Sequence, residues 1–156
     1  MNWFVYRFVF AKAIRSFQFS GDVAKKIPLP KISLEEQKPF IEKSNFMIDK
    51  NKKFYETKNK FIKLIKYKFN LDKISRRLEG FYNLNFKEFV DEIQNKNKTM
   101  SIEKEAELMN FFEKNKKEVL DLVNEISKTE KEIDERVYKL YEITDKEKQI
   151  IKESLK

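Results

Sequence analysis

The stretch GDVAKKIPLPKISLEEQKPFI, residues 21–41, decides how the chain is organised. Gly21 and Asp22 permit a turn, because glycine adopts backbone angles that other residues avoid. In the run IPLP, residues 27–30, each proline fixes its own φ and holds the residue before it extended. Ser33 is followed three residues later by Glu36, which is the pattern of a capping box and predicts a helix start. The stretch therefore separates a compact N-terminal segment from a chain of long helices.

A first long helix is predicted over residues 34–69. Its apolar residues fall in adjacent pairs seven residues apart, and this heptad pattern favours packing against a partner helix. Pro39 lies in the first turns, where a proline is best tolerated. The second half is rich in lysine, so a membrane surface is an alternative partner, although the heptad favours a helix. The pairs and their continuation are Phe40/Ile41, Met47/Ile48, Phe54/Tyr55, Phe61/Ile62, Ile65 and Phe69.

A second long helix is predicted over residues 101–141, with apolar residues that again recur every seven positions. Its natural partner is the first helix, running in the opposite direction. Between the two we expect short helices, the first capped by Asp72 and the second by Asn85, and a small apolar cluster. Thr144 and Glu147 form another capping box that starts a last short helix. The seven-residue column is Phe112, Val119, Ile126, Ile133 and Leu140.

Composition restricts the chemistry that this chain can perform. Of 156 residues, 38% are charged and only 2 are Gly and 3 Pro, which favours long helices. The absence of Cys and His removes disulfides, thiolate metal sites and the commonest general base. We therefore predict no catalytic residue, no metal ligand and no cofactor bound by this chain. A cytoplasmic protein is the default expectation.

The net charge of +8 is unevenly distributed. Residues 1–33 carry six basic residues against one acid, residues 34–100 carry 16 against 10, and residues 101–156 carry 12 against 15. A basic front suits a chain that faces a polyanion, whereas the plainer interpretation is a solvated lysine-rich surface.

The first ten residues, MNWFVYRFVF, are strongly apolar. They are too few to span a bilayer, and no signal-peptide pattern surrounds them. We expect this segment to pack on a larger body, so that the chain begins inside a domain. The alternative is a helix that covers the chain's own long helices.

Two motifs give the chain a resemblance to a known family. RSFQFSGDVAKKIPLPKISLEEQKPFI, residues 15–41, resembles the end of the TaqI-like C-terminal specificity domain of adenine-specific DNA methyltransferases and type IIG restriction–modification enzymes. EIDERVYKLY, residues 132–141, resembles the family's EIDxxVYxLYGLT ending. The chain departs from that ending at Glu142, where the family usually has the glycine of a helix-ending turn.

The spacing of the apolar residues predicts a mainly α architecture, a long antiparallel, coiled-coil-like helical pair with short connecting helices. The resemblance implies that a small remnant of an α/β recognition module precedes it. Residues 1–33 would be the remnant and residues 34–156 a helical arm. The chain would then be a C-terminal specificity fragment, truncated, split or acting as a separate subunit. S-adenosylmethionine and Mg²⁺ would belong to the missing catalytic part, because this chain lacks the Pro-Pro-Tyr loop and the Gly-rich turn.

DNA is the partner that this interpretation predicts, together with a methyltransferase or nuclease portion in trans or formerly in cis. Basic and amide side chains interleaved with Phe17 and Phe19 are the local candidates, since such groups contact phosphates and base edges. A homo-oligomer is a further expectation, and no membrane partner is expected. The main alternative is a stand-alone helical coiled-coil interaction protein without a role on DNA. The candidate DNA-binding residues are Arg7, Lys12, Arg15, Gln18, Lys25, Lys26 and Lys31.

Overall fold

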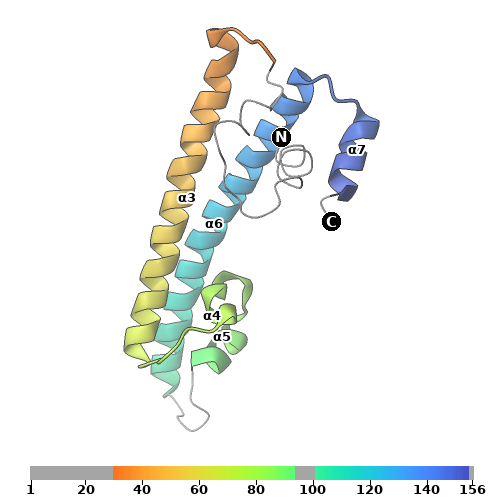
Figure 1. Ribbon diagram of the computed structural model, residues 1–156. Helices are drawn as coiled ribbons and strands as arrows, with labels where there is room; N and C mark the ends of the chain where they lie inside the picture. The colour runs from red at the N-terminus through yellow and green to blue at the C-terminus, as the bar shows by residue number, and fades with distance from the viewer. Residues whose placement is uncertain (1–29, 94–100, 155–156) are drawn as a thin grey trace, which may run out of the picture. The chain divides into compact units, whose positions relative to one another are not determined.

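The computed structural model describes residues 30–93 and 101–154, and every regular element in these ranges is helical. Figure 1 shows the elements in order. They are α3 (Leu34–Lys68), α4 (Arg76–Glu79), the 3-10 helix η2 (Phe81–Asn83), α5 (Phe86–Ile93), α6 (Ile102–Leu140) and α7 (Asp145–Ser154). The mainly α fold class is thus confirmed. The two predicted long helices are α3 and α6, and each predicted end agrees with the structure to within one residue.

The chain divides into two compact units. Unit 1 combines Met1–Lys43 with Glu130–Lys156, and unit 2 is Ser44–Thr129. Each long helix therefore contributes one part to each unit. Nearly all of the predicted recognition module, residues 1–33, lies outside the described residues.

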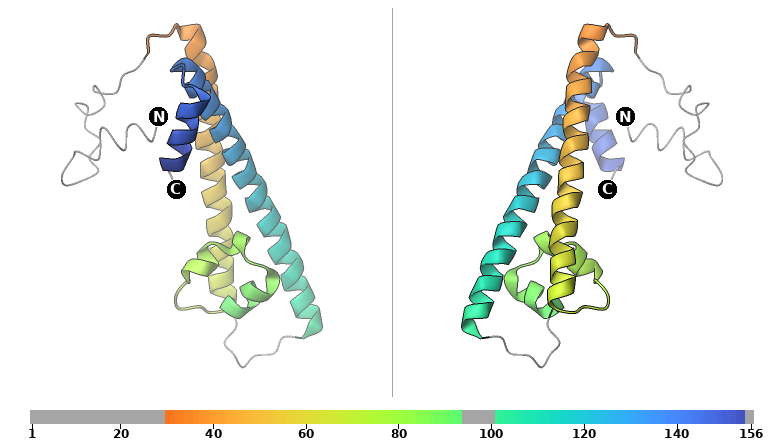
Figure 2. Two further views of the ribbon diagram at one scale, coloured as in Figure 1. Left: turned by 90° about the vertical axis from the view of Figure 1, so that its right-hand side faces the viewer. Right: turned by 90° about the vertical axis from the view of Figure 1, so that its left-hand side faces the viewer.

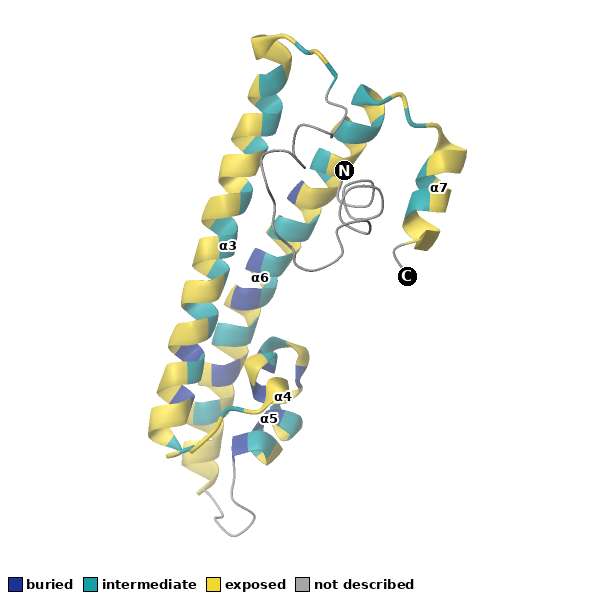
Figure 3. Cartoon of the chain, in the orientation of Figure 1, coloured by how far each residue is buried: buried dark blue, intermediate teal, exposed yellow. Residues whose placement is uncertain are grey.

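In unit 2, α3 and α6 run antiparallel (Figures 1 and 2), and side chains of the two helices meet. Lys50 of α3 forms an ion pair with Glu125 of α6, and the rings of Phe61 and Phe111 stack with centroids 5.6 Å apart. Three of the four predicted adjacent pairs are divided between the two sides of α3. Phe61 is buried and Phe54 is half-buried, whereas Ile48 and Tyr55 are exposed. Figure 3 shows how buried, intermediate and exposed residues alternate along α3. In the first three pairs one member therefore lies nearer the helical interface and the other faces outward, whereas Ile62 is half-buried and packs against the core beside Phe61.

An aromatic core holds four elements of unit 2 together. Phe61 of α3 stacks on Phe81 of η2 with ring centroids 3.9 Å apart, and Phe89 of α5 stacks on Phe112 of α6 at 4.5 Å. All four side chains are at most 1% exposed. At roughly 25 cal/mol per Å² of apolar surface, burial of these rings is the main stabilising contribution in this unit. The predicted apolar cluster of the connector is confirmed, and it packs against the helical pair.

The connector between the long helices differs from the prediction in its first helix. Asp72 was the predicted N-cap, but it precedes a non-helical stretch, and the N-cap is Ser75, whose hydroxyl accepts from the backbone N–H of Leu78 at 3.0 Å. The helix starts late because Leu71 and Ile74, which lie in the non-helical stretch, pack against the core. The prediction for α5 is confirmed.

At the start of α5, Asn85 and Glu88 form a complete capping box. The Asn85 side chain accepts from the backbone N–H of Glu88, and the Glu88 carboxylate accepts from the backbone N–H of Asn85, both at 2.9 Å. A second anchor comes from α6, where the Lys116 ammonium donates to the carbonyl of Leu84 at 2.7 Å. These bonds hold the connector against the helical pair.

In unit 1, the first turns of α3 and the last turns of α6 are joined by the ion pair between Lys43 and Glu132. The short helix α7 returns to the end of α6, where Lys148 lies 3.3 Å from the Glu135 carboxylate and 5.5 Å above the Tyr138 ring. Unit 1 thus brings together residues that are about a hundred positions apart in the chain.

Candidate functional site

The segment before α3 is positioned by the predicted capping box. The Glu36 carboxylate accepts from the backbone N–H and from the hydroxyl of Ser33, each at 2.8 Å, and the backbone N–H of Glu36 donates to that hydroxyl at 3.3 Å. These bonds, the backbone one first, hold the pKa of Glu36 below its ordinary value of 4.5. The side chain of Gln37 donates to the carbonyl of Ile32 at 3.2 Å. The extended residues that precede α3 are thereby tied to its first turn.

The end of α6 forms a turn of the Schellman type. The backbone N–H of Ile143 donates to the carbonyl of Tyr138 at 2.9 Å, and that of Glu142 donates to Lys139 at 3.2 Å. Glu142 has a φ of 52°, in the left-handed region that favours glycine. The helix-ending turn is therefore formed with glutamate at the position where the resembled family usually has glycine.

A second predicted capping box starts α7 directly after this turn. The Glu147 carboxylate accepts from the hydroxyl of Thr144 at 2.7 Å and from its backbone N–H at 2.8 Å. The hydroxyl bond is the larger cause of a pKa for Glu147 below 4.5.

Hydrogen bonds to Asp145 and Glu135 raise the pKa of Lys148. Burial, and then the negative charges of nearby carboxylates, raise the pKa of Tyr138.

These two segments line one pocket of unit 1, which we call the join pocket. From the first motif it takes residues before and within the start of α3, and from the second motif it takes residues of the last turn of α6 and the residue that follows. The lining is mainly apolar, with one lysine and one glutamine. The join pocket is lined by Pro30, Lys31, Ile32, Gln37, Phe40, Ile41, Val137, Leu140 and Tyr141.

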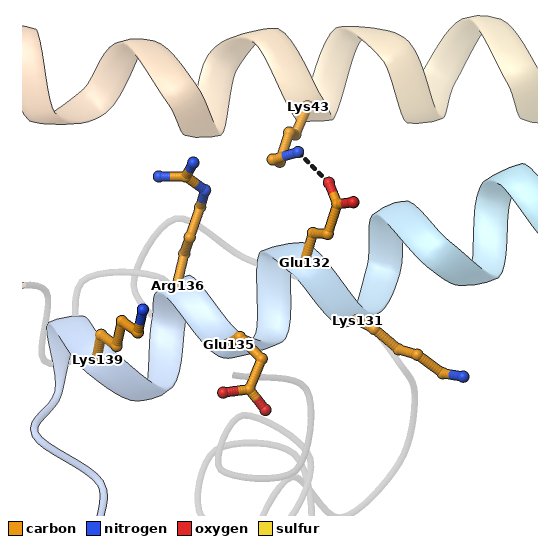
Figure 4. A pocket seen from close by; sticks show the side chains of 6 residues that line it. All are labelled: Lys43, Lys131, Glu132, Glu135, Arg136 and Lys139. Atoms are coloured by element: carbon orange, nitrogen blue, oxygen red, sulfur yellow. Dashed lines mark hydrogen bonds and ion pairs between the residues drawn. The ribbon is translucent and has the colours of Figure 1, made fainter.

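A charged groove lies beside the preceding turns of α6, in the same unit (Figure 4). Lys43 reaches across it to Glu132, and the guanidinium of Arg136 extends toward α3, whereas Lys131 and Glu135 point away from α3. Four of the six lining residues are basic. Such a groove attracts anionic groups, but its six lining residues make no pair of nucleophile and base.

Of the seven predicted DNA-binding residues, the structure places one. Lys31 is exposed and lines the join pocket. The other six, Arg7, Lys12, Arg15, Gln18, Lys25 and Lys26, lie outside the described residues.

The charged groove was not predicted from the sequence. The sequence does contain a pattern that could have indicated the ion pairs between the helices. Lys43 and Lys50 are seven residues apart in the first helix, and Glu125 and Glu132 are seven residues apart in the second. Only the antiparallel pairing shows which lysine meets which glutamate and so leaves Arg136 facing the groove.

Two features are absent from the described ranges. In residues 30–93 and 101–154, no three His, Cys, Asp or Glu side chains are grouped so that they could hold a metal ion. No helix in these ranges is long and apolar enough to cross a membrane.

By its fold the chain is a helical protein built on an antiparallel pair of long helices. The connector between them contributes phenylalanine rings to the core, and the join pocket lies between the start of α3 and the end of α6. A family model described as a domain of unknown function, DUF8810, matches residues 33–137, about two thirds of the chain. The chain belongs to this family. The match starts at Ser33, the N-cap of α3, and ends in the last turn of α6. No curated protein and no solved structure matches the chain.

Proposed function

We propose that this chain is the C-terminal DNA-specificity part of a type IIG restriction–modification enzyme, an adenine-specific DNA methyltransferase that also carries an endonuclease. In this role the chain takes part in target recognition and assembly and does not itself catalyse a reaction. Its partners are DNA and the catalytic portion, in trans or formerly in cis, which would bind S-adenosylmethionine and Mg²⁺ and work in the cytoplasm.

The observation that carries the proposal is the join pocket. The two motifs that resemble the specificity domain are about a hundred residues apart, and residues of both line this pocket. The left-handed φ of Glu142 adds support, because the backbone adopts the glycine conformation of the resembled ending. In the proposed role the pocket keeps the recognition module on the helical arm.

Binding to duplex DNA tests the proposal. The full chain is titrated into a fluorescent 30-base-pair duplex, and anisotropy is measured at several salt concentrations. We expect salt-sensitive binding that Lys25→Glu with Lys26→Glu weakens, because phosphate contacts release counterions. An absence of binding at low salt would count against a role on DNA.

Sequencing of the DNA directly upstream of the Met1 codon tests the enzyme context. A reading frame that encodes a Pro-Pro-Tyr methyltransferase and the early strands of a recognition module is the expected result. Unrelated upstream DNA would favour the second candidate function.

That second candidate is a helical interaction protein without a role on DNA. The outer side of α3 favours it, since Ile41, Ile48 and Tyr55 are 53%, 65% and 56% exposed and recur every seven residues. It predicts a homodimer that Ile48→Asp with Tyr55→Asp dissociates, as measured by sedimentation equilibrium. A monomeric wild-type chain would remove this candidate.

A further inference from the structure

The second half of α3 carries a lysine-rich outer surface that the fold does not use. Residues 57–68 contain five lysines and no acidic residue. Lys60, Lys63 and Lys66 are exposed, and Tyr67 is 87% exposed. We call these four residues the lysine face.

The lysines of the face differ from the inward lysines of the same helix in their partners. Lys43 and Lys50 form ion pairs with glutamates of α6. Within the described part of the chain, no ion pair joins Lys60, Lys63 or Lys66 to an acid. Their charges are therefore available to a partner outside the chain.

Helical geometry places the lysine face on one side of α3. Residues three and four apart are neighbours on a helix surface, so Lys60, Lys63 and Tyr67 follow one another and Lys66 lies beside them. At about 1.5 Å per residue, the distance along the helix from Lys60 to Tyr67 is roughly 10 Å. Phe61 and Ile65 are 1% and 2% exposed on the opposite side, so the core fixes the direction in which the lysine face points.

The chemistry of the face suits a row of phosphates. Lysine binds phosphate as a point charge, and a tyrosine hydroxyl can donate to phosphate oxygens. Duplex DNA carries one negative charge per about 1.7 Å of axis, so a straight helix with three cations over this distance can meet several phosphates.

A membrane is the less suitable partner. A helix that binds at a bilayer surface buries its apolar side among the lipids. In this half of α3 the most apolar side is already covered by the hydrophobic core, which includes Phe61 and Ile65. Beside the lysines, the exposed Leu64 and Tyr67 line a pocket with Phe69, Leu108 and Phe111. The charged residues Lys68, Lys104 and Glu107 line the same pocket, so this surface is not a continuous apolar side of the kind that lipids cover.

We propose that the lysine face binds the phosphate backbone of duplex DNA without reading its sequence. This inference rests on the proposed function and deepens it, because it gives the helical arm a DNA contact separate from the N-terminal lysines. The arm would hold DNA while the recognition module selects the site.

The test compares two triple variants that change the net charge equally. Lys60→Glu, Lys63→Glu and Lys66→Glu alter the lysine face, whereas Lys114→Glu, Lys117→Glu and Lys128→Glu alter exposed lysines of α6. Binding of a random-sequence 30-base-pair duplex is measured by anisotropy between 50 and 200 mM salt. We expect the first variant to lower the slope of log K against log salt by about 0.9 for each phosphate that it no longer neutralises. The α6 variant should retain the wild-type slope.

Helical content is checked by circular dichroism, and Lys60→Gln, Lys63→Gln and Lys66→Gln serve if the glutamates disturb folding. Equal effects of the two triple variants would overturn the inference, because net charge alone would then explain binding. If only Lys25→Glu with Lys26→Glu weakens binding, the lysine face does not touch DNA, but the proposed function stands. If the wild-type chain binds anionic lipid vesicles and no DNA, both proposals fail.

Discussion

Phe61 and Phe81 lie face to face in unit 2, with ring centroids 3.9 Å apart and an angle of 22° between the ring planes. The first belongs to the long helix α3 and the second to the short helix η2, and both are at most 1% exposed. This contact makes the connector part of the core instead of a loop at its edge.

Truncation of either ring should therefore destabilise the whole unit. We expect Phe81→Ala to lower the free energy of unfolding by about 3–5 kcal/mol, because it removes a large buried side chain and leaves a cavity. Chemical denaturation followed by circular dichroism measures the change. Tyr55→Ala, at an exposed position of α3, is the control and should stay within about 0.5 kcal/mol of the wild type. Similar small effects from both would show that the connector does not support the core.

The end of α6 offers a stabilising substitution. Glu142 adopts a φ of 52°, which costs a residue with a Cβ more than it costs glycine. We expect Glu142→Gly to raise the free energy of unfolding by up to about 1 kcal/mol, and Glu142→Ala to bring no such gain. Asn70→Gly, at the equivalent position after α3 with a φ of 48°, should gain less, because asparagine tolerates this conformation. Destabilisation by Glu142→Gly would contradict the turn geometry.

The capping box of α3 predicts a dependence on pH. The pKa of Glu36 is lowered in the folded chain, so its contribution to stability is present above the ordinary value of 4.5 and is lost as the pH falls through the folded pKa. Ser33→Ala removes the hydroxyl bond and should move the pKa of Glu36 back toward 4.5. Carbon-detected NMR titration of the Glu36 carboxyl measures both values. An unchanged pKa in Ser33→Ala would mean that the hydroxyl does not hold the carboxylate.

The register of the helical pair can be tested by exchanging charges. Lys50 pairs with Glu125, and their side chains are 25% and 47% exposed, so each single reversal should cost about 0.2–1 kcal/mol. The double variant Lys50→Glu with Glu125→Lys should recover most of that loss. Lys50→Glu with Glu118→Lys is the matched control, because Glu118 lies seven residues away on α6. Equal recovery by both double variants would show that the register is wrong.

The sequence alone was sufficient for the long helices and the helix starts at Ser33, Asn85 and Thr144. A capping box requires only groups three residues apart, so its hydrogen bonds depend on local chemistry. The recurrence of apolar residues every seven positions likewise predicts that each long helix packs against another helix. The first connecting helix was predicted less well, because its cap at Ser75 depends on where Leu71 and Ile74 can be buried.

The candidate site was less predictable than the fold. Lys31 could be singled out by its charge, but its position beside Leu140 and Tyr141 follows only from the antiparallel arrangement. The same holds for Arg136, whose direction toward α3 depends on the pairing of Lys43 with Glu132.

Spacing along the chain by itself determined that this protein is a pair of long amphipathic helices with capped short helices beside them, because helix formation and capping are local. Tertiary structure alone decided how far each residue of a heptad pair is covered, and that the four rings of the core meet. It also decided that the two distant motifs share one pocket. These features depend on the direction and register of packing, which no short segment of the chain specifies.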